Sequence, residues 1–116
     1  MKPNSINILG KAYSIEYVDK PSDVDIYKRE SLWGQIDYWT RTIRIYANNR
    51  TESDIFETLI HEILHGIEED LKLKAFKEKQ GHDELGILAV ALTDTLIRNN
   101  LVILKNEYFK KGIPCP

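Results

Sequence analysis

The sequence predicts an α+β fold in a single domain covering residues 1–116. Alternating apolar residues separated by turn signals fill the first 46 positions, which indicates strands. Two runs with helical periodicity follow, one from about residue 51 and one from about residue 83. Strands first and helices afterwards is the order typical of α+β proteins, here antiparallel N-terminal strands packed on two helices.

Two hairpins are expected before residue 47. Residues 7–9 and 13–18 read as strands joined at Gly10-Lys11, and a loop begins at Lys20. Residues 33–38 and 42–46 read as the second hairpin, with its turn near residues 39–41. Ile43 and Ile45 should face the same side of the sheet, since side chains alternate along a strand.

The first helix should begin after Thr51, which is a good N-cap, with Asp54 in the capping-box position three residues later. It should run to about residue 70. On a helical wheel, one face is apolar and is expected to face the core, and the adjacent face is left free to form the floor of a cleft. The expected core face holds Phe56, Ile60, Ile63, Leu64 and Ile67, and the free face holds Thr58, His61, Glu62 and His65.

The second helix is expected from Asp83 to about Asn99, where two asparagines suit its end. Residues 71–80 either extend the first helix or form a loop. The apolar residues at 101–104 and 108–109 suggest a final strand or arm, and residues 112–116 should be frayed.

The first helix contains His61-Glu62-Ile63-Leu64-His65, a match to the H-E-x-x-H motif. Residues four apart lie on one face of a helix, so the two imidazoles can bind one Zn²⁺. Glu62 can lean over the metal without coordinating it, where a general base is needed. The simpler interpretation is that both histidines are solvated on the polar side of the helix.

A catalytic zinc site needs a third protein ligand. Glu84 is the leading candidate because it is centred on an apolar face of the second helix, where a carboxylate must be paired, protonated or bound to metal. It could instead be an N-terminal capping residue of that helix. His82 and Asp83 are rival ligands of suitable type. A third ligand within the same run is excluded, because positions 68 and 71 are Glu68 and Leu71 rather than glycine and histidine.

His61-Glu62-x-x-His65 followed by Glu84 on a new helix resembles the gluzincin metallopeptidases. The small size and element order resemble the zincin-like minigluzincins, in particular ImmA/IrrE-like and phage- or prophage-encoded metallopeptidases. The resemblance covers about residues 33 to 100 and implies a zinc ion held by His61, His65 and Glu84, with Glu62 as catalytic base.

The chain departs from the gluzincin pattern in two ways. Some gluzincins place an aspartate four residues after the third ligand to orient a histidine, and here that position is Leu88. Asp94 or a backbone carbonyl would have to serve instead. An oxyanion-stabilising residue is not evident, and Tyr38, Tyr46 and His82 are its candidates.

The expected function is hydrolysis of a peptide bond by metal-activated water, with Glu62 as general base. The substrate would be a peptide or protein, with a protein partner to present it as a further possibility. Strand 42–46 could pair with an extended substrate at the cleft rim or could be an ordinary interior strand. The alternative function is a regulatory or binding protein that holds zinc with little or no turnover. A deformylase-type amidase would need a cysteine upstream of the helix, and Cys115 is far downstream.

The composition fits a soluble globular domain, with 42% apolar and 29% charged residues. A net charge of −2 gives no support for a nucleic-acid or membrane partner. The N-terminal apolar run is too short for a signal peptide, so the expected location is the cytoplasm.

Overall fold

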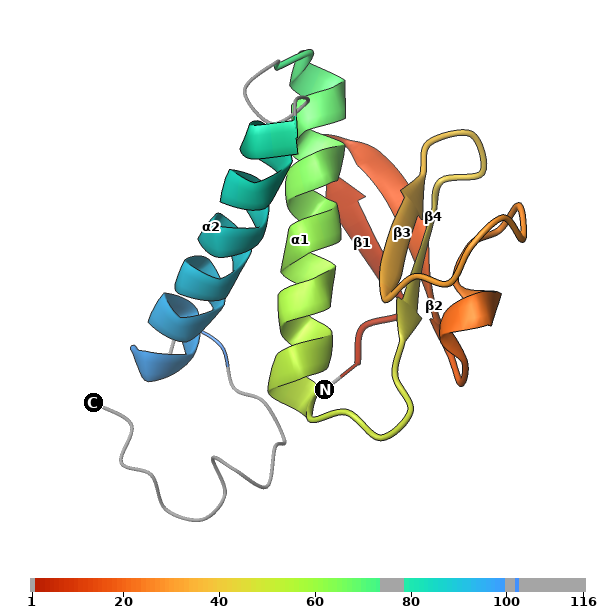
Figure 1. Ribbon diagram of the computed structural model, residues 1–116. Helices are drawn as coiled ribbons and strands as arrows, with labels where there is room; N and C mark the ends of the chain where they lie inside the picture. Colours follow the sequence, from red (N-terminus) through yellow and green to blue (C-terminus); the bar gives the residue numbers. More distant parts are fainter. Residues whose placement is uncertain (1, 74–78, 100–101, 103–116) are drawn as a thin grey trace.

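The computed structural model of the protein describes residues 2–73, 79–99 and 102, and its elements follow the predicted order (Figure 1). The strands β1 (Ser5–Ile8) and β2 (Lys11–Val18) form the first hairpin. The strands β3 (Gly34–Asp37) and β4 (Thr42–Tyr46) form the second. The helices are α1 (Glu52–Leu71) and α2 (Lys79–Arg98). The α+β class and both hairpins are therefore confirmed.

The four strands form one mixed sheet in the order β1-β2-β4-β3. Each hairpin is antiparallel as predicted, but β2 and β4 pair in parallel, so the expectation of an antiparallel sheet is wrong at this junction. The cause is the connection from β2 to β3, which includes a short 3₁₀ helix at Pro21–Asp23. It carries the chain to the far edge of the sheet, and β4 then returns alongside β2. Strand β4 is thus interior and β3 lies at an edge.

The core lies between the sheet and α1. In the parallel pairing Ile15 is opposite Ile43, and the alternation of side chains buries Ile43 and Ile45 on the same face, as predicted. The buried cluster draws on three strands and α1 and consists of Ile8, Tyr13, Ile15, Ile43, Ile45, Ile55 and Leu59. The opposite face of the sheet is polar, with an ion pair between Arg44 and Glu16.

The capping residues of α1 define its two ends. The Thr51 hydroxyl accepts a hydrogen bond from the backbone N–H of Asp54 at 3.1 Å, which confirms the predicted N-cap. At the other end Lys72 adopts a left-handed conformation with φ 56°. The N–H groups of Lys72 and Leu73 then bond to the carbonyls of Glu69 and Glu68, which closes the last turn.

Helix α1 is covered on two sides, by the sheet on one and by α2 on the other (Figure 1). The stripe toward the sheet is Ile55, Leu59, Glu62 and Gly66, at helical spacing. The predicted core face is therefore only partly right. Ile60 is buried and Phe56, Ile63 and Ile67 pack on the cluster from its edge, but Glu62, expected on the free face, is buried. The predictions for residues 74–78 and for the segment after Asn99 lie outside the described residues, Val102 excepted.

Candidate metal centre

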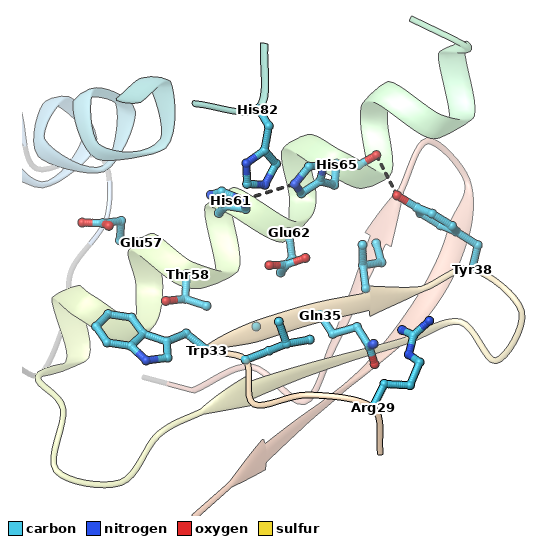
Figure 2. A pocket seen from close by; sticks show the side chains of 13 residues that line it. Arg29, Trp33, Gln35, Tyr38, Glu57, Thr58, His61, Glu62, His65 and His82 are labelled. Atoms are coloured by element: carbon cyan, nitrogen blue, oxygen red, sulfur yellow. Dashed lines mark hydrogen bonds between the residues drawn. The ribbon is translucent and has the colours of Figure 1, made fainter. Parts of the chain in front are cut away.

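His61 and His65 point the same way from successive turns of α1 (Figure 2). Their Nε2 atoms lie 3.2 Å apart. Two ligands each about 2.05 Å from a tetrahedral Zn²⁺ would be about 3.3 Å apart, so the pair has the separation that such an ion requires. The helix backbone alone fixes this arrangement, because it stacks residues i and i+4.

His82, at the start of α2, reaches over the same spot. Its ring centroid lies 5.3 Å from that of His61 and 5.2 Å from that of His65. One ring nitrogen from each of the three residues can be chosen so that all lie within 4.8 Å of one another. His61 and His65 are partly buried and His82 is exposed, so the group is open to solvent on the His82 side.

Glu84, the leading third-ligand candidate, is not part of this group. The buried stripe of α2 is Leu85, Ala89, Thr93 and Ile97, whereas Glu84, Ile87 and Leu88 are exposed. The prediction that the face centred on Glu84 is the buried one is therefore wrong, because α2 is rotated about its axis and buries a different face. Glu84 is two positions from His82, about 200° around the helix, so the packing that brings His82 to α1 turns Glu84 away. Asp83 is also exposed and outside the group.

Small residues explain how α2 comes so close. His82, Gly86, Ala89 and Thr93 follow one another at helical spacing, and a β-carbon added to Gly86 would lie 3.8 Å from Cε1 of His61. The backbone of α2 therefore passes directly beside the His61 imidazole. This small-residue stripe was the sequence signal that could have selected His82 over Glu84.

Glu62 lies beneath the histidines, between α1 and the edge strand β3. It is 7% exposed, and a β-carbon added to Gly34 would lie 2.9 Å from its Oε2 atom. Burial raises the pKa of Glu62 to about 8, although a hydrogen bond from the backbone of Ile36 opposes the shift. A carboxyl group that titrates near neutrality, next to a candidate metal site, is suited to accept and donate protons.

His61 and His65 are kept in the neutral form, which is the form that binds metal. Burial, followed by the neighbouring His65 and His82, lowers the pKa of His61 to about 4. Burial also lowers the pKa of His65. Neutral imidazoles bind zinc through a free ring nitrogen, so the lowered pKa values of His61 and His65 suit a zinc ion, and the His82 imidazole adds a third nitrogen of the same type.

Glu68 contacts His65 and is placed to orient its ring. Its Oε1 atom lies 3.5 Å from Nδ1 of His65, one turn further along α1, and Glu68 is 5% exposed. A carboxylate on Nδ1 directs Nε2 toward a metal. Asp94, a candidate for this role from the sequence, is instead exposed and paired with Arg98. The i,i+3 spacing of His65 and Glu68 was a signal that could have revealed the pair.

The three histidines open into a cleft of about 570 Å³. Figure 2 shows Trp33, Glu57 and Thr58 on one side of the histidines and Arg29, Gln35 and Tyr38 on the other. The Tyr38 hydroxyl donates to the backbone carbonyl of His65 at 3.2 Å, and Tyr38 lines the cleft. Tyr46 does not line it and instead contacts Arg50. Of the three candidates for oxyanion stabilisation, only Tyr38 and His82 thus face the cleft.

The strand beside the cleft is β3. Residues 34–36 line it, whereas β4 is interior, so the idea that strand 42–46 forms the rim is wrong. The backbone carbonyl of Trp33 accepts a hydrogen bond from the backbone N–H of Tyr46. Because hydrogen-bonded and non-hydrogen-bonded positions alternate along an antiparallel pair, the N–H and C=O groups of Gly34 and Ile36 then point away from β4. Those groups are positioned to meet an extended ligand or, at Ile36, the Glu62 carboxylate.

A buried network stiffens the wall of the cleft next to β3. The Asp25 carboxylate is fully buried and accepts hydrogen bonds from Arg29 and from the Gln35 amide. These bonds, led by the Arg29 guanidinium, hold the pKa of Asp25 far below its usual range. The loop before β3 is thereby tied to the strand that borders the cleft.

No family model matches the chain, and no curated protein or solved structure matches it. Among the described residues, no helix combines the length and apolarity needed to cross a membrane.

Proposed function

We propose that the protein is a zinc-dependent hydrolase of peptide bonds, with His61, His65 and His82 as the metal ligands and Glu62 as the general base. The observation that carries the proposal is the convergence of three ring nitrogens within 4.8 Å, directly above a buried carboxylate. A site used only to hold the fold together would need no such carboxylate. The minigluzincin resemblance of the motif supports the same chemistry, with His82 in the place expected for Glu84.

A zinc ion held by these residues would polarise the substrate carbonyl and make an attacking water more acidic. Glu62 takes the proton from that water at a carboxylate oxygen and returns it to the leaving amine. Burial between α1 and Gly34 keeps the carboxylate in place and its pKa close to neutrality. Glu68 fixes the ring of His65 throughout.

The substrate main chain is expected to lie along β3. The outward-facing backbone groups of Gly34 can bond to an extended peptide as an added strand does. A peptide aligned in this way would have its scissile bond next to Glu62, since the Gly34 backbone and the Glu62 carboxylate are neighbours.

The test compares the wild type with Glu62→Gln after zinc reconstitution. Elemental analysis should give about one zinc per chain for both proteins, since Glu62 is not a ligand. Cleavage of a peptide mixture, followed by mass spectrometry, should be seen only with the wild type. Zinc binding without cleavage would favour the alternative, a regulatory or binding protein. Cleavage that survives the Glu62 change unaltered would refute the mechanism.

A further inference from the structure

Glu57 is a cleft residue that the proposed reaction does not use. It lies one helical turn before His61 on α1, is partly buried and lines the cleft. Burial raises its pKa, and the neighbouring Asp54 adds to the shift. Among the described residues no hydrogen bond or ion pair reaches its carboxylate. The charge of Arg50 opposes the shift without a hydrogen bond or ion pair to Glu57, so the carboxylate is available to a ligand in the cleft.

Arg50, the cation whose charge acts on Glu57, makes its hydrogen bonds to other groups. Its guanidinium donates to the carbonyls of Tyr46 and Asp54 at 2.7 and 3.0 Å and to the Thr58 hydroxyl at 2.7 Å. It also lies 4.8 Å from the centre of the Trp33 ring and is not among the residues that line the cleft. Arg50 therefore binds groups outside the cleft lining and leaves the Glu57 carboxylate open to the cleft.

Trp33 lines the same end of the cleft as Glu57. The residue is 64% exposed, and its side chain lines the cleft. Figure 2 shows Trp33 and Glu57 on the same side of the histidines, with Thr58 between them. An aromatic surface beside a carboxylate suits a side chain that combines an apolar stem with a cationic end.

We propose that Trp33 and Glu57 form a subsite for a basic side chain of the substrate, either lysine or arginine. This inference rests on the proposed function, because it places the subsite beside the scissile bond. One helical turn is about 5.4 Å and one residue of an extended chain about 3.3 Å. The basic residue therefore lies within about two positions of the bond that is cleaved, and a neutral or acidic side chain there leaves Glu57 unpaired.

The probe is a peptide library in which Lys, Gln or Glu is fixed at one position at a time. Zinc-loaded Glu62→Gln serves for binding and the wild type for cleavage. We expect lysine to be preferred at one position near the cleavage site in both assays. Adding Glu57→Gln should reduce that preference roughly tenfold or more, the loss of about 1.4 kcal/mol. Glu57→Lys should move the preference to glutamate.

Glu69→Gln is the matched control, since it removes a carboxylate from the same helix outside this cleft. It should leave the preference unchanged, and melting temperatures should show that the Glu57 variants fold. Cleavage with no basic preference, or one that survives both Glu57 changes, overturns the subsite but leaves the proposed function standing. Lysine-selective binding without wild-type cleavage overturns the hydrolase and keeps the subsite. Neither binding nor cleavage overturns both.

Discussion

The Nδ1 atom of His65 lies 3.5 Å from Oε1 of Glu68, one helical turn further along α1. Burial of Glu68 at 5% exposure keeps this contact away from competing water. One helix thus supplies two of the candidate ligands, the candidate base and the group that orients one of the ligands. The pairing makes the geometry of His65 depend on a residue that would not itself touch the metal.

Replacing Glu68 by Gln should weaken zinc binding about 10- to 100-fold, because an amide holds the Nδ1 proton less strongly than a carboxylate does. Competition with a chromophoric chelator measures the affinity. Glu69→Gln, at the adjacent position of the helix, is the control and should retain wild-type affinity. An unchanged affinity in Glu68→Gln would show that the contact does not orient the ligand.

Zinc content should separate the two third-ligand candidates. His82→Ala should lower the zinc retained after dialysis well below one per chain, because it removes a nitrogen from the group of three. Glu84→Ala should retain about one, because Glu84 is exposed on the other side of α2. Elemental analysis of both proteins beside the wild type makes the measurement. Zinc retained by His82→Ala but lost from Glu84→Ala would identify Glu84 as the third ligand instead.

In metal-free protein, stability should fall as pH rises from 6.5 to 8. Folded Glu62 keeps its proton up to about pH 8, whereas in the unfolded chain it is ionised above about 4.5. The folded state therefore binds more protons in this window, and stability should drop by about 2 kcal/mol at 1.36 kcal/mol per unit. His61 offsets only part of this drop. Its pKa is lowered from 6.5 to about 4, so it is neutral in the folded state, but in the unfolded chain it is half protonated at pH 6.5 and loses that proton by pH 8, which favours the folded state by about 0.4 kcal/mol.

Urea unfolding at several pH values in the presence of a chelator tests this dependence. Glu62→Gln should remove most of the slope and should be more stable than the wild type at pH 8. Saturating zinc should also reduce the slope, because a nearby cation favours the ionised carboxylate. A wild-type stability that stays flat from pH 6.5 to 8 would mean that Glu62 is not buried as described.

Gly34→Ala should be destabilising by about 1–3 kcal/mol, since its β-carbon would lie 2.6 Å from Cγ2 of Thr58 and 2.9 Å from Oε2 of Glu62. Gly86→Ala is the contrast. Its β-carbon would meet His61 at an ordinary 3.8 Å, and alanine favours the helix by about 1 kcal/mol. Thermal unfolding should show a lower melting temperature for Gly34→Ala only. Equal effects would argue against the close approach of β3 to α1.

Hydrophobic periodicity alone could not predict the rotation of α2. Apolar residues occur around most of this helix, so Ile87, Leu88 and Val90 remain exposed while Leu85 and Ala89 are buried. Periodicity selects a face only when the other faces are polar. The stripe of small residues at Gly86, Ala89 and Thr93 packs against α1 because small side chains permit a close approach of the two helices. This packing brought in His82 and turned Glu84 away.

The sequence by itself determined the two hairpins, the capped start of α1 and the pairing of His61 with His65. These features depend on contacts between near neighbours, which local backbone geometry fixes. Only the tertiary structure decided that β3 rather than β4 borders the cleft, that Glu62 is buried against Gly34 and that His82 completes the group. Each of these features depends on which residues of separate elements come into contact, and those residues are distant in the chain, so local sequence patterns do not determine them.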